Sequence, residues 1–267
     1  MNKVIVSTVT AMIQGHPWDL WGLACLLDGS NTEGLAVFAV KPKGQPRIDH
    51  KSPEAVQRFR RSGYNLQGNL SSNTLDQAFA RGAALDELAS VAANLVTRIN
   101  GTAKLLDPEY YLVRLLSVTT PSGMHILAQH TPNKDYTSLG RHVSQAPAAL
   151  AFIELAGRDH AANFLLETFN LPISWASLYL AYDCIMASVG GVHRLRDMGW
   201  VSNEELSDFA YTANKTRDVR SGIRHGSHPD ANLEKPFIPL HQGHSTVMRL
   251  AICWMGWRLT QAGTADR

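Results

Sequence analysis

The residues best suited to chemistry lie in one basic stretch, residues 212–228. It holds four Lys or Arg and one Asp, a formal charge of +3, whereas the whole chain of 267 residues carries +2 with His counted as neutral. The remaining residues therefore sum to −1, so the small overall charge conceals a local basic site. Arg217, Arg220 and Arg224 follow one another at intervals of three and four residues, and on a continuing helix they would share one face.

Clustered arginines beside histidine predict phosphate chemistry. Three guanidinium groups on one face repel one another unless an anion lies opposite them, and the planar fork of arginine binds phosphate with two parallel hydrogen bonds. His225 adds an imidazole that titrates near neutral pH and can move protons. These parts suffice for metal-independent cleavage of RNA, because the 2′-hydroxyl of the substrate is the nucleophile. The predicted nucleic-acid- or phosphate-binding residues are Lys215, Arg217, Arg224 and His228.

More specific catalytic signatures are absent from the sequence. It contains no Gly-Lys-Ser/Thr phosphate loop, no His-Glu-x-x-His and no Gly-x-Ser-x-Gly. Cys25, Cys184 and Cys253 are odd in number and lack the spacing of zinc ligands or of a redox pair. We expect them to be buried thiols in a reducing compartment. The sequence therefore predicts no metal site and no cofactor.

The bulk composition is that of an ordinary globular protein. Hydrophobic residues make up 45% and charged residues 18% of the chain, close to typical values. A net charge of +2 is too small to indicate a polyanion partner by itself. Because no apolar stretch reaches the roughly 18 residues that a membrane span needs, we expect a cytoplasmic protein with no membrane partner.

The elements that must position the basic stretch differ between the two parts of the chain. Short β-rich runs come first, and two of them flank the turn signal at residues 28–31, which predicts a hairpin. Most of the stretch 41–73, rich in Pro and Gly, is expected to be loop. The predicted strands are Val4–Thr8, Leu20–Leu27 and Leu35–Val40.

A helical period then begins near Leu75. Apolar residues from Leu85 to Ile99 step by three and four, and Asn100-Gly101 supplies a predicted helix stop. Strands are expected at Tyr110–Thr119 and Met124–Gln129. Residues 1–135 are therefore predicted to form a small α+β domain, to which the sequence assigns no role.

After about residue 140 the strand signals end and successive helices are predicted. One runs from Trp175 to Val189 before Gly190-Gly191, and a last one carries Trp254 and Trp257. Between them, Ser202 and Glu205 match a capping box. We place a domain boundary at the polar run 131–135 and predict an all-α domain over residues 140–267.

The spacing Arg220, four residues, His225-Gly226 resembles the Arg-x(4–6)-His motif of the HEPN family, with Ser221 in the polar position after the arginine. The stretch from Trp175 through Tyr211-Thr212-Ala213-Asn214 to the last helix also resembles a group of bacterial proteins with a HEPN-like C-terminal domain. In the first part, Ile99-Asn100-Gly101 followed by Asp107-Pro108 is similar to the smaller domain that precedes the helices in that group.

The resemblance implies an antiparallel helical bundle that forms a homodimer and joins the Arg-His motifs of two protomers in one cleft. Active members of the family are endoribonucleases, many in antiviral defence or toxin–antitoxin systems, so it implies RNA and a neutralising or activating protein as partners. By position, Arg220 would hold the scissile phosphate, His225 would act in acid–base chemistry and Ser221 would support them. Asp183, four residues after Tyr179, would orient Arg220.

Other interpretations of the same segment stay open. The shared element with the bacterial group is equally Arg224-His225-Gly226, which would make this pair structural or ligand-binding. Cations near a helix C-terminus also complement its dipole, and Gly222 and Gly226 each weaken a helix by roughly 1 kcal/mol relative to Ala. A non-catalytic module that binds RNA, nucleotide or protein, or a structural partner that dimerises through the faces of Trp175 or Trp254, would explain the sequence too.

Overall fold

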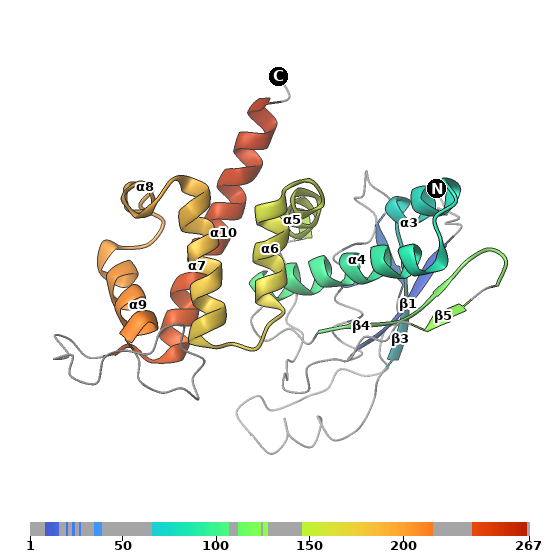
Figure 1. Cartoon of the computed structure of the whole chain (residues 1–267), viewed down its shortest axis with the longest axis horizontal. Helices are drawn as coiled ribbons and strands as arrows, with labels where there is room; N and C mark the ends of the chain where they lie inside the picture. Colours follow the sequence, from blue (N-terminus) through green and yellow to red (C-terminus); the bar gives the residue numbers. More distant parts are fainter. Residues whose placement is uncertain are drawn as a thin grey trace, which may run out of the picture. The chain divides into compact units, whose positions relative to one another are not determined.

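The computed structural model divides the chain into two compact units, residues 1–150 and 151–267, which we treat separately. Figure 1 shows the strands in the first unit, whereas the elements described in the second unit are helices. The predicted α+β class is thus confirmed, whereas the polar run 131–135 lies in a part that the structure does not describe. The described residues are 9–15, 20, 23–24, 27, 35–38, 66–106, 112–123, 125–127, 146–215 and 237–265.

The first unit is built on an antiparallel sheet. Its five described strands lie in the order β2-β3-β1-β4-β5, with β1 at the centre. Along β1, buried and partly exposed residues alternate, as expected for a strand with one face in a core. The strands are β1 (Thr10–Gly15), β2 (Ala36–Phe38), β3 (Leu66–Ser71), β4 (Arg114–Thr119) and β5 (His125–Leu127).

Two helices of this unit follow β3 directly. The first, α3 (Asn73–Ala80), begins where the Ser72 hydroxyl accepts a hydrogen bond from the Thr74 amide, the usual N-cap interaction. The second, α4 (Leu85–Leu106), contacts β4 and β5. Its apolar residues at helical spacing are buried, as the sequence period predicts, and include Leu88, Ala92, Leu95, Val96 and Ile99.

Asn100 corrects the predicted end of this helix. Instead of stopping at Asn100-Gly101, α4 continues to Leu106. The buried Asn100 side chain donates from Nδ2 to the Val113 carbonyl at 2.7 Å and accepts from the Val113 amide at Oδ1 at 3.0 Å. It therefore satisfies both main-chain groups of the residue before β4, and this long-range partner outweighs the local stop signal.

The strand predictions are partly wrong. The central β1 and its neighbour β3 were not predicted, because β1 mixes polar with apolar residues and β3 contains Gly68 and Asn69, which are typical of loops. The predicted strand Leu20–Leu27 is helical at each position that the structure describes. The later strands are confirmed as β2, β4 and β5, and Val4–Thr8 lies among the undescribed residues.

Helices of the second unit surround α7. This helix contacts α6, α8, α9 and α10, and Figure 1 shows it between α6 and α9. It ends as predicted, with Gly190 in the left-handed region at φ 92°. The helices are α5 (Ala146–Arg158), which crosses the division between the units, α6 (His160–Phe169), α7 (Trp175–Val189), α8 (Val192–Asp197), α9 (Asn203–Lys215) and α10 (Leu240–Ala265).

The helices can also be compared with the requirements for crossing a membrane. Within the described ranges, no helix combines the length and the apolar character that crossing a bilayer requires.

Asn100 gives the first test of this fold. Replacing Asn100 with Ala should lower the free energy of unfolding by about 2–4 kcal/mol, because the buried amide and carbonyl of Val113 lose their partner. Chemical denaturation measures the change. Asn163→Ala is the matched control, since the Asn163 side chain makes an exposed contact with Glu167, and it should cost less than about 0.5 kcal/mol. Equal effects from the two variants would refute this role of Asn100.

Candidate nucleic-acid interface

The structure describes the helices on both sides of the basic stretch, which we also call the basic segment, and two of the predicted site residues. Lys215 is the last residue of α9, and Asp183 lies on α7. The other predicted residues fall within 216–236, which lie outside the described part of the chain: Arg217, Arg220, Ser221, Arg224, His225 and His228. Their roles remain predictions, and the geometry that follows is that of the helices on both sides.

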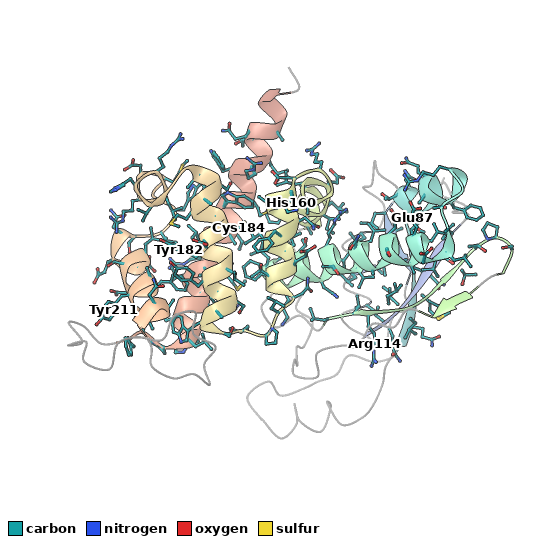
Figure 2. All side chains as sticks on the ribbon, viewed as in Figure 1. Glu87, Arg114, His160, Tyr182, Cys184 and Tyr211 are labelled. Atoms are coloured by element: carbon teal, nitrogen blue, oxygen red, sulfur yellow. The ribbon has the colours of Figure 1, made fainter. Side chains whose placement is uncertain are left out.

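The two flanks of residues 216–236 contact each other. The amide of Ile238 donates a hydrogen bond of 3.2 Å to the hydroxyl of Thr212, which is fully buried. Beside it, the rings of Tyr211 and Phe237 lie 5.8 Å apart; Figure 2 labels Tyr211 on α9. The chain therefore leaves α9 and returns to α10 at the same end of the helical unit. We call these four residues the clasp.

The clasp residues were not identified from the sequence. Tyr211-Thr212 precedes residues 216–236 and Phe237-Ile238 follows them, and each pair is an aromatic residue followed by a β-branched one. This resemblance between the two flanks is the only sequence signal for them, and it becomes informative once the flanks are known to meet. Considered separately, each pair has the composition of ordinary core residues.

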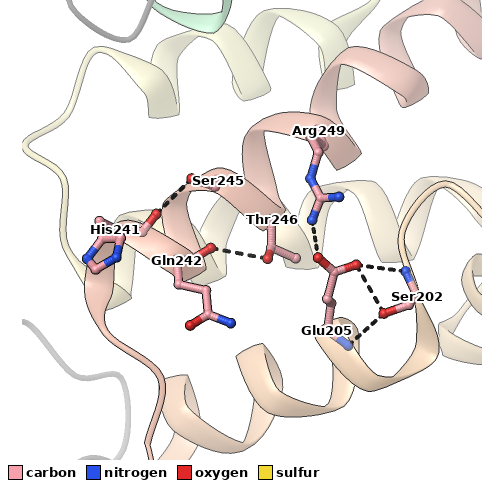
Figure 3. Close-up of polar contacts among 7 residues, drawn as sticks. All are labelled: Ser202, Glu205, His241, Gln242, Ser245, Thr246 and Arg249. Atoms are coloured by element: carbon pink, nitrogen blue, oxygen red, sulfur yellow. Dashed lines mark hydrogen bonds and ion pairs between the residues drawn. The ribbon is translucent and has the colours of Figure 1, made fainter.

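A second interaction at the opposite end of α9 fixes the direction of α10. The Ser202 amide donates to the Glu205 carboxylate at 3.0 Å, and the Glu205 amide donates to the Ser202 hydroxyl at 3.1 Å (Figure 3). This confirms the predicted capping box. Arg249 of α10 donates to the same carboxylate, and this hydrogen bond and the one from the Ser202 amide hold the pKa of Glu205 below its usual range. Because Arg249 meets the start of α9, whereas Ile238 meets its end, α10 runs antiparallel to α9.

Hydroxyl groups on the first turns of α10 bond to their own helix. Ser245 donates to the His241 carbonyl at 2.9 Å, and Thr246 donates to the Gln242 carbonyl at 3.1 Å (Figure 3). Both follow the i to i−4 pattern of helical Ser and Thr. These donors are therefore directed to the helix backbone in this structure.

Gly243 lets α10 approach α7 closely at the clasp end. A Cβ atom on Gly243 would lie 2.6 Å from Cζ3 and 2.8 Å from Cη2 of Trp175, the first residue of α7. Further along, the Trp254 indole N–H donates to the Ser188 hydroxyl at 3.0 Å. The starts of α7 and α10 therefore lie together, and the two helices run parallel.

An aromatic cluster fills the space between α7 and α9. The ring of the fully buried Phe209 lies 6.0 Å from Trp175, 5.4 Å from Tyr182 and 6.4 Å from Tyr179, with which it stacks at an interplanar angle of 18°. Burial, together with the neighbouring Tyr179, raises the pKa of Tyr182. The rings therefore fix α9 on α7 next to the residues that precede the basic segment.

Asp183 lies one helical turn after Tyr179 and is partly exposed. Residues four apart share a face of a helix, so Asp183 and Tyr179 lie on one side of α7. The Tyr179 hydroxyl is 3.5 Å from the Asn214 amide nitrogen near the end of α9. The structure thus brings the Asp183 face of α7 toward α9, while the pairing of Asp183 with Arg220 stays a prediction.

Asp159 joins α6 to α10 outside the predicted site. Its carboxylate accepts from the amides of Ala161 at 2.9 Å and Ala162 at 3.1 Å, and from Nε of Arg258 at 2.8 Å. Burial alone would raise the pKa of Asp159, but the hydrogen bonds from Ala162 and Arg258 and the charge of Arg258 together lower it below its ordinary value. Asp159 thus serves both as the N-cap of α6 and as an ion-pair partner.

The described cysteines are free and partly buried. Cys184 points its sulfur toward the Ala161 carbonyl at 3.6 Å, and burial raises the pKa of its thiol to about 11; Figure 2 labels it on α7. The thiol therefore stays protonated at neutral pH. In the described ranges, no three His, Cys, Asp or Glu side chains gather as metal ligands would.

Gly243 gives a test of the close approach between α7 and α10. Gly243→Ala should destabilise the protein by roughly 1–3 kcal/mol, because the new methyl group overlaps the Trp175 ring. Gly256→Ala on the same helix is the control, since its Cβ would meet no atom within 4 Å; the higher helix propensity of Ala should stabilise it by roughly 0.5–1 kcal/mol. In urea denaturation, the free energy of unfolding should therefore fall in Gly243→Ala and rise in Gly256→Ala. An unchanged or higher free energy of unfolding in Gly243→Ala would contradict the geometry.

The interactions of Asp159 predict that the protein loses stability in acid. Its folded pKa lies below the ordinary 3.8, so its contribution to stability is complete above that value and is lost as the pH falls through the folded pKa. Asp159→Asn should therefore cost on the order of 1 kcal/mol at neutral pH and nothing at the acid end. Asp197→Asn, at an exposed position of α8, should keep the wild-type acid dependence. Urea denaturation between pH 7 and 2 tests this, and parallel curves for wild type and Asp159→Asn would contradict it.

No protein-family model matches the chain, and no match was found among curated proteins or solved structures. The resemblance to the HEPN family therefore rests on the residues of the sequence, among them Arg220, Ser221 and His225.

Proposed function

We propose that this protein is a metal-independent endoribonuclease of the HEPN type that acts through residues 212–228. The observation that carries the proposal is that a segment with a formal charge of +3 lies between two packed helices, α9 and α10. The segment begins inside the last turn of α9, and the clasp joins that turn to the residues before α10 at one end of the helical unit. Functional groups held on segments between rigid elements are a common design for binding and catalysis.

In the proposed reaction, the RNA supplies the nucleophile. The 2′-oxygen attacks the adjacent phosphorus, its proton passes to a base, and the bond to the 5′-oxygen of the next nucleotide breaks as that oxygen gains a proton. The products are a 2′,3′-cyclic phosphate and a 5′-hydroxyl end. Arg220 binds the phosphate oxygens and stabilises their developing charge, and His225 carries out proton transfer. Ser221 supports them, and Asp183 orients Arg220.

The proposal extends to partners and setting. A homodimer would bring two Arg-His motifs into one cleft and supply a second set of cations to the same RNA. An RNase of this kind limits growth of the cell that makes it, which suits antiviral defence or a toxin–antitoxin pair with a neutralising or activating protein. A bacterial cytoplasm is the proposed location.

Non-catalytic binding of RNA or a nucleotide is the second candidate. Two observations favour it: Arg224 directly precedes His225, and three arginines are more than a single scissile phosphate requires. In this case Arg217, Arg220 and Arg224 would bind phosphates along the ligand, and affinity would fall steeply as the salt concentration rises.

Single-residue variants separate the two candidates. His225→Ala should lower the rate of cleavage of a single-stranded RNA by about 100-fold or more and relieve growth inhibition on expression, while RNA affinity stays within about threefold. His193→Ala on α8, an exposed histidine, is the control and should behave as wild type. Cleavage and toxicity equal to wild type from a folded His225→Ala would sink the nuclease.

The arginines distinguish the competing pairs. If Arg220 is the catalytic cation, Arg220→Ala should lower the cleavage rate far more than Arg224→Ala. Salt-sensitive binding without cleavage by the wild type would favour the second candidate. Unchanged affinity after removal of Arg217, Arg220 and Arg224 would refute both.

A further inference from the structure

A polar contact attaches the last turn of α9 to α7 just before the basic segment. The Asn214 side chain donates from Nδ2 to the Ala210 carbonyl at 2.9 Å, and the same nitrogen lies 3.5 Å from the Tyr179 hydroxyl, at the long end of hydrogen-bond distances. Both side chains are partly buried. Asn214 is followed at once by Lys215 and three residues later by Arg217.

Packing alone does not require either polar group. The Tyr179 ring stacks on Phe209 and lies 5.6 Å from Tyr182, contacts that Phe would make equally well. Asn is a poorer helix former than Ala or Leu, yet it occupies the last turn of α9 next to the buried Ala213. The hydroxyl of Tyr179 and the amide of Asn214 instead meet where the chain leaves the aromatic cluster.

We infer that Tyr179 and Asn214 are positioning residues for the reaction at the basic segment, an inference that rests on the proposed function. By holding the end of α9 on α7, they fix the point from which Arg217 and Arg220 follow. Since misplacing a catalytic group by about 1 Å costs as much as 100-fold in rate, a small movement of this turn is expected to slow the proposed reaction. Asp183 lies one turn further along the same face of α7.

The role predicts a defined kinetic signature. Tyr179→Phe and Asn214→Ala should each lower kcat for RNA cleavage by about tenfold and leave KM within about twofold, because alignment at the transition state is lost while phosphate binding remains. The melting temperatures should stay close to wild type. The double variant should be no slower than the slower single variant, because one contact is removed in both.

Matched controls exist in the same helical unit. Tyr182→Phe removes a hydroxyl from the same aromatic cluster, and Asn163→Ala removes an exposed amide from α6; both should keep wild-type kcat. Wild-type kcat in Tyr179→Phe and Asn214→Ala would overturn the inference and leave the nuclease in place. The inference would also be overturned if the two single-variant losses of kcat multiplied in the double variant, or if the losses of kcat followed a fall in melting temperature. Absence of cleavage by wild type would instead overturn the proposed function and the inference with it.

Discussion

Burial of α7 is the constraint on which the helical unit depends. The helix is apolar on most of its surface, and its buried residues follow one another at intervals of one, three and four along one face: Trp175, Leu178, Ala181, Tyr182, Ile185 and Val189. A helix of this kind is stable only when neighbours cover it. The contacts of α6, α8, α9 and α10 with α7 meet that need, so the end of α9 and the start of α10 are placed by what α7 must bury. The frame of the basic segment follows from hydrophobic packing.

Ion pairs refine this arrangement without creating it. Glu205–Arg249 and Asp159–Arg258 both end on α10 and tie it to α9 and to the N-cap of α6. Pairs that are open to solvent contribute about 0–1 kcal/mol each, whereas full burial of a side chain such as Trp254 contributes several times more. Their main effect is on register, because each carboxylate also accepts from the backbone at the start of a helix. Asp159 accepts from the amides of Ala161 and Ala162, and Glu205 accepts from the amide of Ser202.

The sequence predicted the helical half better than the sheet, for a physical reason. The capping box at Ser202 and the glycine stop at Gly190 depend on neighbours a few residues away. By contrast, β1 is a strand because β3 and β4 pair with it from more than 50 residues away, and Asn100 lies inside a helix because Val113 needs its amide. The arginine and histidine residues of the candidate site indicate phosphate chemistry from the sequence alone. The clasp could not be predicted in the same way, because its residues are far apart in the sequence and no local pattern connects them.

The entropy of closing the segment shows which interactions keep the clasp together. Thr212 and Ile238 are 26 residues apart in sequence, and bringing two positions at that separation together costs about 3 kcal/mol of chain entropy, plus a constant. A single hydrogen bond contributes a net of about 1 kcal/mol, so the Thr212–Ile238 bond cannot hold the flanks together by itself. The cost is offset mainly by packing of α9 and α10 around α7, where Phe209 and Gly243 both meet Trp175. The basic residues can therefore vary in sequence without loosening their frame, provided that this junction is kept.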